Sequence, residues 1–365
     1  MSAPITVQTT FFGLNAQDWP STGAAPSFPF GSYSNFDNKR THWRSLHSAS
    51  NTINWANLDA VVAGVQAQGV TDGLYVLYGC PTFLAQAGQA AQAGPYSGLG
   101  EGSFPTDLAQ LTYFCQQFVA RNASTWGGFF KRVQLFNEPE GGNFSGTAST
   151  TSFFWGSAVQ YVDMLWTAYT ALKTAAPSLE ILTPGTYAVT TFATWLDAVG
   201  ATTSKHGYEC FDAVALHPYH AKPNPTYSGR GDFFSLYQGG LLSAQAILAA
   251  RGRTGLRYYA SEYGLDSSGS SGVVATFLAL TAAERSTYFQ RLRMSAARSG
   301  FAGMYLWSLG NTANLCGDLA TDTTGVIAGE TAANAAMSGK TIISGGWYPD
   351  GREQLTFSDG STYVV

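Results

Sequence analysis

The sequence is poor in charge. Only 12% of its 365 residues are Asp, Glu, Lys or Arg, about half of the usual share in soluble proteins. The net charge is −4 at pH 7, and no cluster of Lys and Arg is present that could neutralise phosphates. These features exclude a nucleic-acid partner, because nucleic-acid-binding domains carry clustered basic side chains.

Cysteine is scarce as well, and long apolar runs are missing. The cysteines are Cys80, Cys115, Cys210 and Cys316. None forms a C-x-x-C pair, so we expect no zinc site. Buried free thiols are the simplest expectation, and if disulfides form instead, three pairings of the four cysteines remain open. No apolar run reaches the ~18 residues of a spanning helix. The start of the given sequence has no Lys or Arg before Lys39 and no long apolar segment, so we expect no intact signal peptide in it.

Apolar and aromatic residues are abundant. Hydrophobic residues make up 45% of the chain and aromatic residues 14%, with 9 Trp and 19 Tyr, so a sizeable core is expected and disorder is not. A weakly charged chain that is rich in aromatic rings suits an uncharged polar ligand that stacks on them, such as a sugar. The length fits one large barrel or two ordinary domains.

Eight short apolar runs alternate with longer helix-like segments. This alternation is typical of βα units, and near-continuous apolar runs are typical of parallel strands covered on both faces. The runs are Thr10–Asn15, Phe30–Phe36, Gly73–Tyr78, Arg132–Asn137, Leu179–Thr183, Phe211–His217, Arg257–Ser261 and Gly303–Ser308. The clearest helices are Trp55–Gln68, Pro105–Arg121, Phe153–Ala176 and Thr281–Ser299.

These elements predict an α/β fold. Residues 1–338 are expected to form a (β/α)8 TIM barrel. Residues 339–365 contain Asp-Gly turns between β-forming residues, so we expect a small C-terminal β hairpin or appendage packed on the barrel. Two doubly wound domains are the alternative, but no linker near the middle of the chain supports them.

Polar residues end several of the predicted strands, where a barrel carries its catalytic groups. Asn137-Glu138-Pro139 follows the fourth run, and Ser261-Glu262-Tyr263-Gly264 follows the seventh. These strands are three steps apart in an eight-stranded ring, so the two glutamates can face each other across its mouth. A facing pair of carboxyl groups is what hydrolysis of a glycosidic bond requires.

With these two motifs, the sequence resembles the retaining glycoside hydrolases of clan A. The segments Trp55–Asp59 and Leu77–Pro81, and the run from Trp307 to the C-terminal β tail, resemble the family 39-like and related family 5-like enzymes of that clan. The resemblance extends over about residues 10–360.

The resemblance implies a role for each matching residue. Glu138 would be the acid/base and Glu262 the nucleophile. Asn137 would bind the sugar 2-hydroxyl, and Trp307 would be the floor on which the sugar ring stacks. The other predicted substrate-binding residues are His217, Tyr219, Tyr187 and Tyr263.

One position departs from the family pattern. The family often has an Arg near the end of strand two that steadies the nucleophile, whereas this sequence has Ser34 at the equivalent place. Arg40 and Arg44 are the residues that could substitute for it.

The expected function is hydrolysis of β-glycosidic bonds in a polysaccharide or oligosaccharide, with net retention and with no metal or organic cofactor. Long predicted loops favour endo action on an extracellular substrate, with a microbial exopolysaccharide as one candidate. We expect a secreted or extracellular monomer. A transglycosylase with the same residues, a non-catalytic carbohydrate-binding barrel and a structural barrel remain alternatives, and the sequence does not decide the sugar or the linkage.

Overall fold

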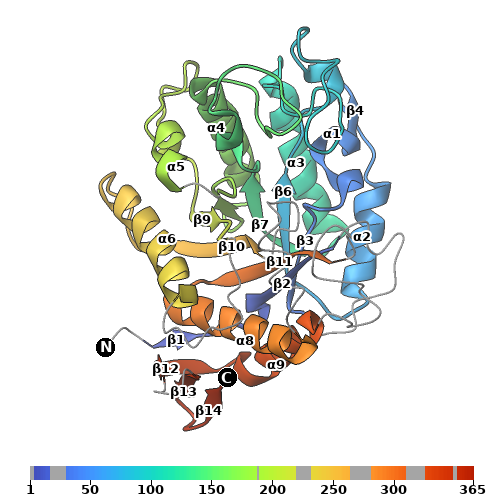
Figure 1. Cartoon of the computed structure of the whole chain (residues 1–365). Coiled ribbons are helices and arrows are strands. Elements are labelled where there is room, and N and C mark those ends of the chain that lie inside the picture. Colours follow the sequence, from blue (N-terminus) through green and yellow to red (C-terminus); the bar gives the residue numbers. More distant parts are fainter. Residues whose placement is uncertain are drawn as a thin grey trace. The chain divides into compact units, whose positions relative to one another are not determined.

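The computed structural model describes residues 4–16, 30–186, 189–218, 232–263, 281–309, 325–347 and 352–365. Within these ranges, eight strands close a parallel barrel in the order β10-β11-β2-β3-β6-β7-β8-β9 (Figure 1). The strands are β2 Phe12–Ala16, β3 Ser32–Ser34, β6 Gly73–Leu77, β7 Phe130–Leu135, β8 Glu180–Leu182, β9 Ala213–Leu216, β10 Arg257–Tyr263 and β11 Gly303–Leu309. Each predicted run overlaps one of these strands, so the predicted barrel is confirmed.

The barrel strands are buried along their length, as parallel strands between a barrel interior and a layer of helices must be. Every residue of β6 and of β9 is buried. Strands β6, β7 and β8 pair side by side: Tyr75 lies opposite Val133, and Val133 opposite Ile181. The apolar sequences of the strands therefore reflect burial on both faces.

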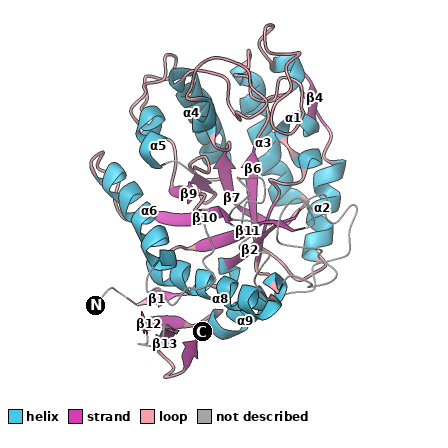
Figure 2. Ribbon diagram, viewed as in Figure 1, coloured by secondary structure: helices cyan, strands magenta, loops and turns pink. Residues whose placement is uncertain are grey.

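Helices follow most of the strands and flank them (Figure 2). The described helices are α1 Trp43–Leu46, α2 Ala56–Gln66, α3 Leu108–Ser124, α4 Ala158–Ala175, α5 Val189–Leu196, α6 Asp232–Ala249, α8 Ala282–Ser299 and α9 Val326–Met337. Helix α8 begins at a capping box, since the Thr281 hydroxyl accepts from the Glu284 N–H and the Glu284 carboxylate accepts from the Thr281 N–H. Helix α4 begins five residues later than predicted, at a capping box that Ser157 forms with Gln160.

By its internal contacts, the chain divides into two compact units. The first comprises residues 1–33, 217–243 and 258–365, and the second comprises residues 34–216 and 244–257. Helices α3 and α4 pack together in the second unit, and α8 and α9 pack together in the first. The predicted domain boundary between residues 338 and 339 stays a prediction.

A four-stranded antiparallel sheet lies in the first unit. It contains β12 Thr341–Trp347, β13 Glu353–Phe357 and β14 Thr362–Val364, as expected for a C-terminal appendage. Its fourth strand, β1, was not predicted: Ile5–Thr6 pairs with β12, with Ile5 opposite Ile342. The appendage is therefore completed by a segment from near the other end of the chain.

Two expectations from composition can be compared with the described residues. Cys80, Cys115 and Cys210 are buried free thiols, whose pKa values burial raises, while Cys316 lies outside the described residues. Within the described ranges, no helix combines the length and apolar character that crossing a bilayer requires.

Candidate active site

Glu262 lies at an irregular point of strand β10. The register between β10 and β11 shifts between Ala260 and Tyr263, so the ladder is interrupted around Glu262. Irregularities of this kind turn a side chain away from the direction that a regular strand would give it, and they are frequent beside active sites. The neighbouring residue Ser261 is fixed from the barrel interior, because the buried Asn15 amide at the end of β2 donates to its carbonyl oxygen at 3.1 Å.

His217, which directly follows β9, contacts this segment with both ring nitrogens. Its Nδ1 lies 3.6 Å from Glu262 Oε2, and its Nε2 lies 3.1 Å from Ser261 Oγ. The imidazole and the carboxyl group are both buried, with only 3% and 5% of the two residues exposed. His217, which the sequence predicted to bind substrate, thus lies beside Glu262 within the first unit.

In the second unit, Asn137 and Glu138 leave strand β7 in a strained backbone conformation. Phe136 has φ 75° and Glu138 has φ 33°, both in the left-handed region that residues other than glycine seldom adopt. Two hydrogen bonds from one side chain hold this turn: Gln134 Nε2 donates to Asn137 Oδ1 at 3.3 Å and to Phe136 O at 2.9 Å. Such strain persists only where surrounding contacts enforce it, and it is concentrated at functional sites.

The Glu138 turn is also joined to the end of the next strand, β8. The Glu138 N–H donates to Gly185 O at 2.8 Å. One residue further along, the Thr186 hydroxyl donates to Glu140 Oε1. Glu140 is almost fully buried, and its charge adds to burial in raising the pKa of Tyr161. The Glu138 backbone is therefore held directly by its hydrogen bond to Gly185 O, and the turn that contains it is held by the hydrogen bond between Glu140 and Thr186.

Tyr263 lies in the interior of the first unit. It is fully buried, and its hydroxyl donates to Glu330 Oε1 at 2.7 Å. Arg293 packs against the Tyr263 ring, with its guanidinium carbon 4.5 Å from the ring centroid, and forms a buried ion pair with the same Glu330. Tyr263 directly follows Glu262, so these contacts connect the Glu262 segment to helices α8 and α9.

Several predicted site residues cannot be placed. Tyr219 and Tyr187 lie outside the described residues, and Trp307 belongs to β11 but its side chain is not described. The register between β11 and β2 shifts between Leu306 and Leu309, so Trp307 lies in an irregular stretch like that of Glu262.

The strand-two arginine has no counterpart at position 34. Ser34 is buried, and its hydroxyl accepts from the Phe36 N–H at 3.4 Å. Of the two possible substitutes, Arg40 is exposed, and Arg44 forms an ion pair with Glu101 at 3.0 Å. Arg44 thus forms an ion pair with the loop that follows β6.

Sequence reasoning missed two residues of this region, Asn15 and Glu140. Asn15 ends the predicted run Thr10–Asn15, and a polar residue at the end of an apolar strand is the signal that could have found it. Glu140 directly follows the Asn-Glu-Pro motif, where a charged residue is expected to be an exposed turn residue. Only the structure shows that it is buried and accepts a hydrogen bond from Thr186.

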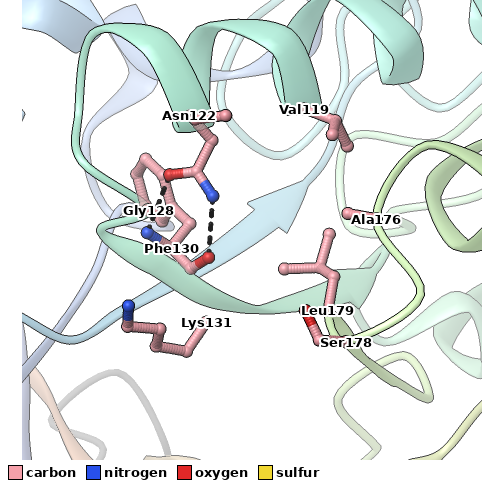
Figure 3. A pocket seen from close by; sticks show the side chains of 9 residues that line it. Val119, Asn122, Gly128, Phe130, Lys131, Ala176, Ser178 and Leu179 are labelled. Carbon is pink, nitrogen blue, oxygen red and sulfur yellow. Dashed lines mark hydrogen bonds between the residues drawn. The ribbon is translucent and has the colours of Figure 1, made fainter.

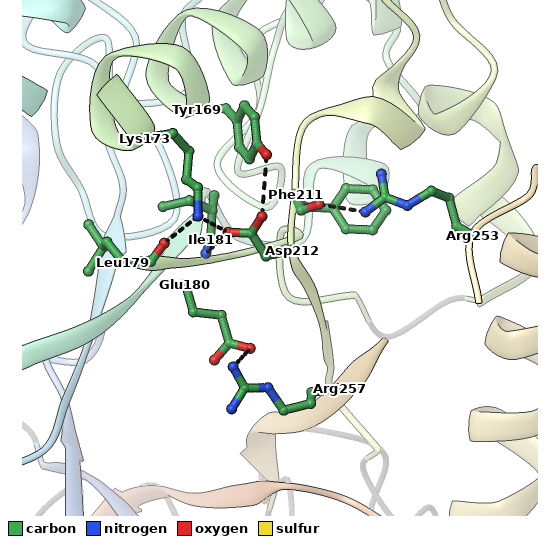
Figure 4. Close-up of polar contacts among 9 residues, drawn as sticks. All are labelled: Tyr169, Lys173, Leu179, Glu180, Ile181, Phe211, Asp212, Arg253 and Arg257. Carbon is green, nitrogen blue, oxygen red and sulfur yellow. Dashed lines mark hydrogen bonds and ion pairs between the residues drawn. The ribbon is translucent and has the colours of Figure 1, made fainter. Parts of the chain in front are cut away.

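The opposite ends of strands β8 and β9 carry a network of ion pairs (Figure 4). Asp212 accepts from Lys173 Nζ at 2.9 Å, from Tyr169 Oη at 3.3 Å and from the Ile181 N–H at 3.0 Å. Glu180 pairs with Arg257 at 2.6 Å. No strained backbone accompanies these contacts among the described residues, which is typical of the stabilising face of a barrel.

An open pocket of about 380 Å³ lies at this same end (Figure 3). Val119, Phe130 and Leu179 give it apolar walls, and Lys131 lies at its edge. The Asn122 side chain, also in the lining, is engaged with both the N–H and the carbonyl oxygen of Phe130. None of the predicted site residues lines the pocket.

Comparison with known proteins shows similarity in structure only. No family model matches the sequence, and no curated protein is significantly similar to it. A glucosidase from Croceicoccus marinus superposes with a TM-score of 0.62 and 13% identity, over 96% of this chain and 74% of its own. A monomeric beta-xylosidase from Caulobacter crescentus gives a TM-score of 0.62 and 14% identity, over 89% of this chain and 66% of its own.

A third similar structure is the catalytic domain of a family 30 xylanase C from Talaromyces cellulolyticus. Its TM-score is 0.56 at 14% identity, over 99% of this chain and 84% of its own. Other similar structures are described as endoglucanases of families 5 and 44. The fold is therefore shared with glycoside hydrolases of several families, whereas the finer family 39-like resemblance stays a prediction.

Proposed function

We propose that this protein is a retaining glycoside hydrolase that cleaves β-glycosidic bonds, with Glu138 as acid/base and Glu262 as nucleophile. The observation that supports it best is the position of the two glutamates in the barrel order. Glu138 follows β7 and Glu262 ends β10, and these strands are three steps apart through β8 and β9. The similarity to glycosidase structures of the same fold adds to this support.

In the proposed reaction, a carboxylate oxygen of Glu262 attacks the anomeric carbon of the sugar. The bond from that carbon to the leaving oxygen breaks, and this oxygen takes the proton of Glu138. In the second step the Glu138 carboxylate removes a proton from water, which attacks the same carbon and releases Glu262. Two inversions give net retention.

His217 suits the role of a positioning group for the nucleophile. With a proton on Nδ1, the neutral ring donates toward Glu262 Oε2, and Nε2 accepts from the Ser261 hydroxyl. This arrangement favours the ionised form of Glu262, which the first step needs. The Asn15 contact to Ser261 O adds rigidity to the same segment.

The remaining predicted contacts are part of the proposal. Asn137 binds the 2-hydroxyl of the sugar in the cleaved position, while Trp307, Tyr219 and Tyr187 line its surroundings. A secreted or extracellular location, endo action and a polysaccharide or oligosaccharide substrate follow from the weakly charged composition and the long loops.

The proposal is tested by incubating the protein with xylan, β-glucan, and xylo- and cello-oligosaccharides, with products read by mass spectrometry and proton NMR. We expect the β anomer to form first. Glu138→Gln and Glu262→Gln should each lower the rate by at least about a thousandfold, or roughly 4 kcal/mol of activation free energy. Asp359→Asn, in the exposed part of the appendage, is the matched control.

Three outcomes would contradict parts of the proposal. Unchanged sugar release by either Gln variant would remove the assignment of that residue. First appearance of the α anomer would indicate an inverting reaction. Products longer than the substrate would favour the transglycosylase, and binding without any release of sugar would favour the non-catalytic barrel.

A further inference from the structure

Aromatic rings from three neighbouring loops meet in the second unit. The loops follow β3, β6 and β7, which are adjacent in the barrel. Ring centroids lie 5.4 Å apart for Phe36 and Tyr96, 5.5 Å for Tyr78 and Phe153, and 6.1 Å for Tyr96 and Phe153. Phe36 and Tyr78 are buried, whereas Tyr96 and Phe153 are partly exposed. Two accessible rings therefore rest on two buried ones.

Tyr96 is held in place by buried charge. Its N–H donates to Glu101 Oε1 at 2.6 Å, and the Gly98 N–H donates to Glu101 Oε2 at 3.0 Å. Glu101 is fully buried and pairs with Arg44, while burial raises its pKa. A Cβ atom at Gly98 would collide with both charged side chains, so the loop can close around this pair only with glycine there.

The hydroxyl and ring edge of Tyr96 are fixed too. Its hydroxyl donates to Asp37 Oδ1 at 3.4 Å, and Asp37 is only 4% exposed. The ring stands edge-on to His42, 5.2 Å away. His42 is fully buried with its Nε2 2.6 Å from Phe36 O, and burial lowers its pKa to about 3, so the ring is neutral.

The contacts that hold Tyr96 carry a free-energy penalty that simple core packing would not need. Burying two carboxylates under a surface loop carries a desolvation penalty that is recovered only in part by ion pairing. A ring that served only as core filler would be completely covered and would need no such support. A rigid, accessible ring is instead what binding demands, because little conformational entropy is lost when a ligand settles on it.

We propose that Tyr96 and Phe153 form a platform that binds one uncharged sugar residue of the substrate, beside the residue that is cleaved. Sugar C–H groups pack on the two rings, and a sugar hydroxyl reaches Lys39, whose Nζ lies 5.5 Å from the Tyr96 centroid. The platform adjoins the proposed acid/base, since Tyr78 also contacts Phe136, 5.1 Å away and two residues before Glu138. This inference rests on the proposed function.

The first test measures binding of xylohexaose and cellohexaose by calorimetry, with Glu138→Gln as the background so that the sugars persist. Tyr96→Ala and Phe153→Ala should each weaken binding of the preferred hexasaccharide by about tenfold or more, whereas Tyr96→Phe, which keeps the ring, should recover most of the affinity. Phe83→Ala is the matched control, because Phe83 is a 40% exposed ring on a neighbouring segment.

The second test needs no substitution in the platform. Nitration of the tyrosines of the Glu138→Gln protein by tetranitromethane is followed by peptide mass spectrometry, with and without the hexasaccharide. We expect the sugar to protect Tyr96 several-fold and to leave the partly exposed Tyr113 on helix α3 unchanged.

Three results would overturn the platform while leaving hydrolysis by the wild type intact. The affinity could be unchanged in both alanine variants, Phe83→Ala could lose as much affinity as they do, or the sugar could fail to protect Tyr96 from nitration. A wild-type protein that neither binds nor cleaves these sugars would overturn the platform together with the proposed function.

Discussion

Strand β8 has a buried carboxylate near each of its ends, and the two are held differently. At the amino end, Glu180 pairs with Arg257, a side chain that is 64% exposed. Beyond the carboxyl end, Glu140 is buried and accepts from the Thr186 hydroxyl. The first arrangement neutralises a charge, and the second fixes the turn that contains Glu138.

The same contrast holds for the backbone. The amino ends of β8 and β9 have regular conformations, and Asp212 accepts from three donors there. At the carboxyl end of β7, Phe136 and Glu138 both have positive φ. One end of these strands is thus built for stability, and the other keeps strain and buried polar groups in place, which is the usual division of a TIM barrel.

The largest effects should come from exchanging a carboxylate at each end for its amide. Glu138→Gln should remove nearly all activity and leave the melting temperature close to that of the wild type. Asp212→Asn should lower the free energy of unfolding by about 1–2 kcal/mol, because a charged acceptor of three hydrogen bonds is lost, with kcat unchanged. Denaturant unfolding and initial rates of sugar release check both. Loss of kcat in Asp212→Asn would break the comparison.

A smaller effect is expected from Glu140. Glu140→Gln and Thr186→Val should each lower kcat by about tenfold, or ~1.4 kcal/mol, with little change in KM, because Glu138 is less well positioned. The pH dependence of kcat should shift on the limb that reports the acid. Glu180→Gln is the matched control at the other end of β8, and its kcat should stay that of the wild type. Equal kcat values in all three variants would show that Glu140 does not position Glu138.

The smallest effect concerns a buried carboxylate in the first unit. Glu353 of β13 is fully buried near Ser295 and Arg298, and burial raises its pKa from 4.5 to about 7 against the opposing effect of Arg298. Because the pKa is higher in the folded state, the stability from the protonated form is complete below about pH 4.5 and is lost as the pH rises through about 7.

The melting temperature of Glu353→Gln minus that of the wild type should therefore increase between pH 5 and pH 8, when each is measured at several pH values. A difference that does not vary with pH would show that Glu353 has the same pKa in the folded and unfolded states.

The barrel could be predicted because its signals are local. Strands such as Gly73–Leu77 are apolar throughout, and a capping box at Thr281 and Glu284 marks a helix start without reference to the rest of the chain. The expected start of α3 was less accurate. Asp107 caps this helix, while the Thr106 hydroxyl donates to Leu84 O in a contact that local sequence does not reveal.

The candidate site could be predicted only in part for the same reason. Glu138, Glu262 and His217 each stand at or just after the end of an apolar run, which is why the sequence singles them out, but the contact of His217 with Glu262 is seen only in the structure. Tyr263 was expected at the substrate, but its role depends on Glu330, 67 residues away, which binds its hydroxyl. The support of Tyr96 by Glu101 likewise depends on Arg44, which reaches the loop from a different βα segment.

The pairing of β1 with β12 has a consequence for how the protein acquires its structure. Thr6 and Thr341 are 335 residues apart in the chain, yet their hydroxyls lie 2.9 Å from each other. During synthesis, β1 emerges long before its partner strand and must wait until β12 has left the ribosome. Contacts of such long range slow folding. Once β1 is in place, it covers the edge of β12, which would otherwise be open to strands of other chains.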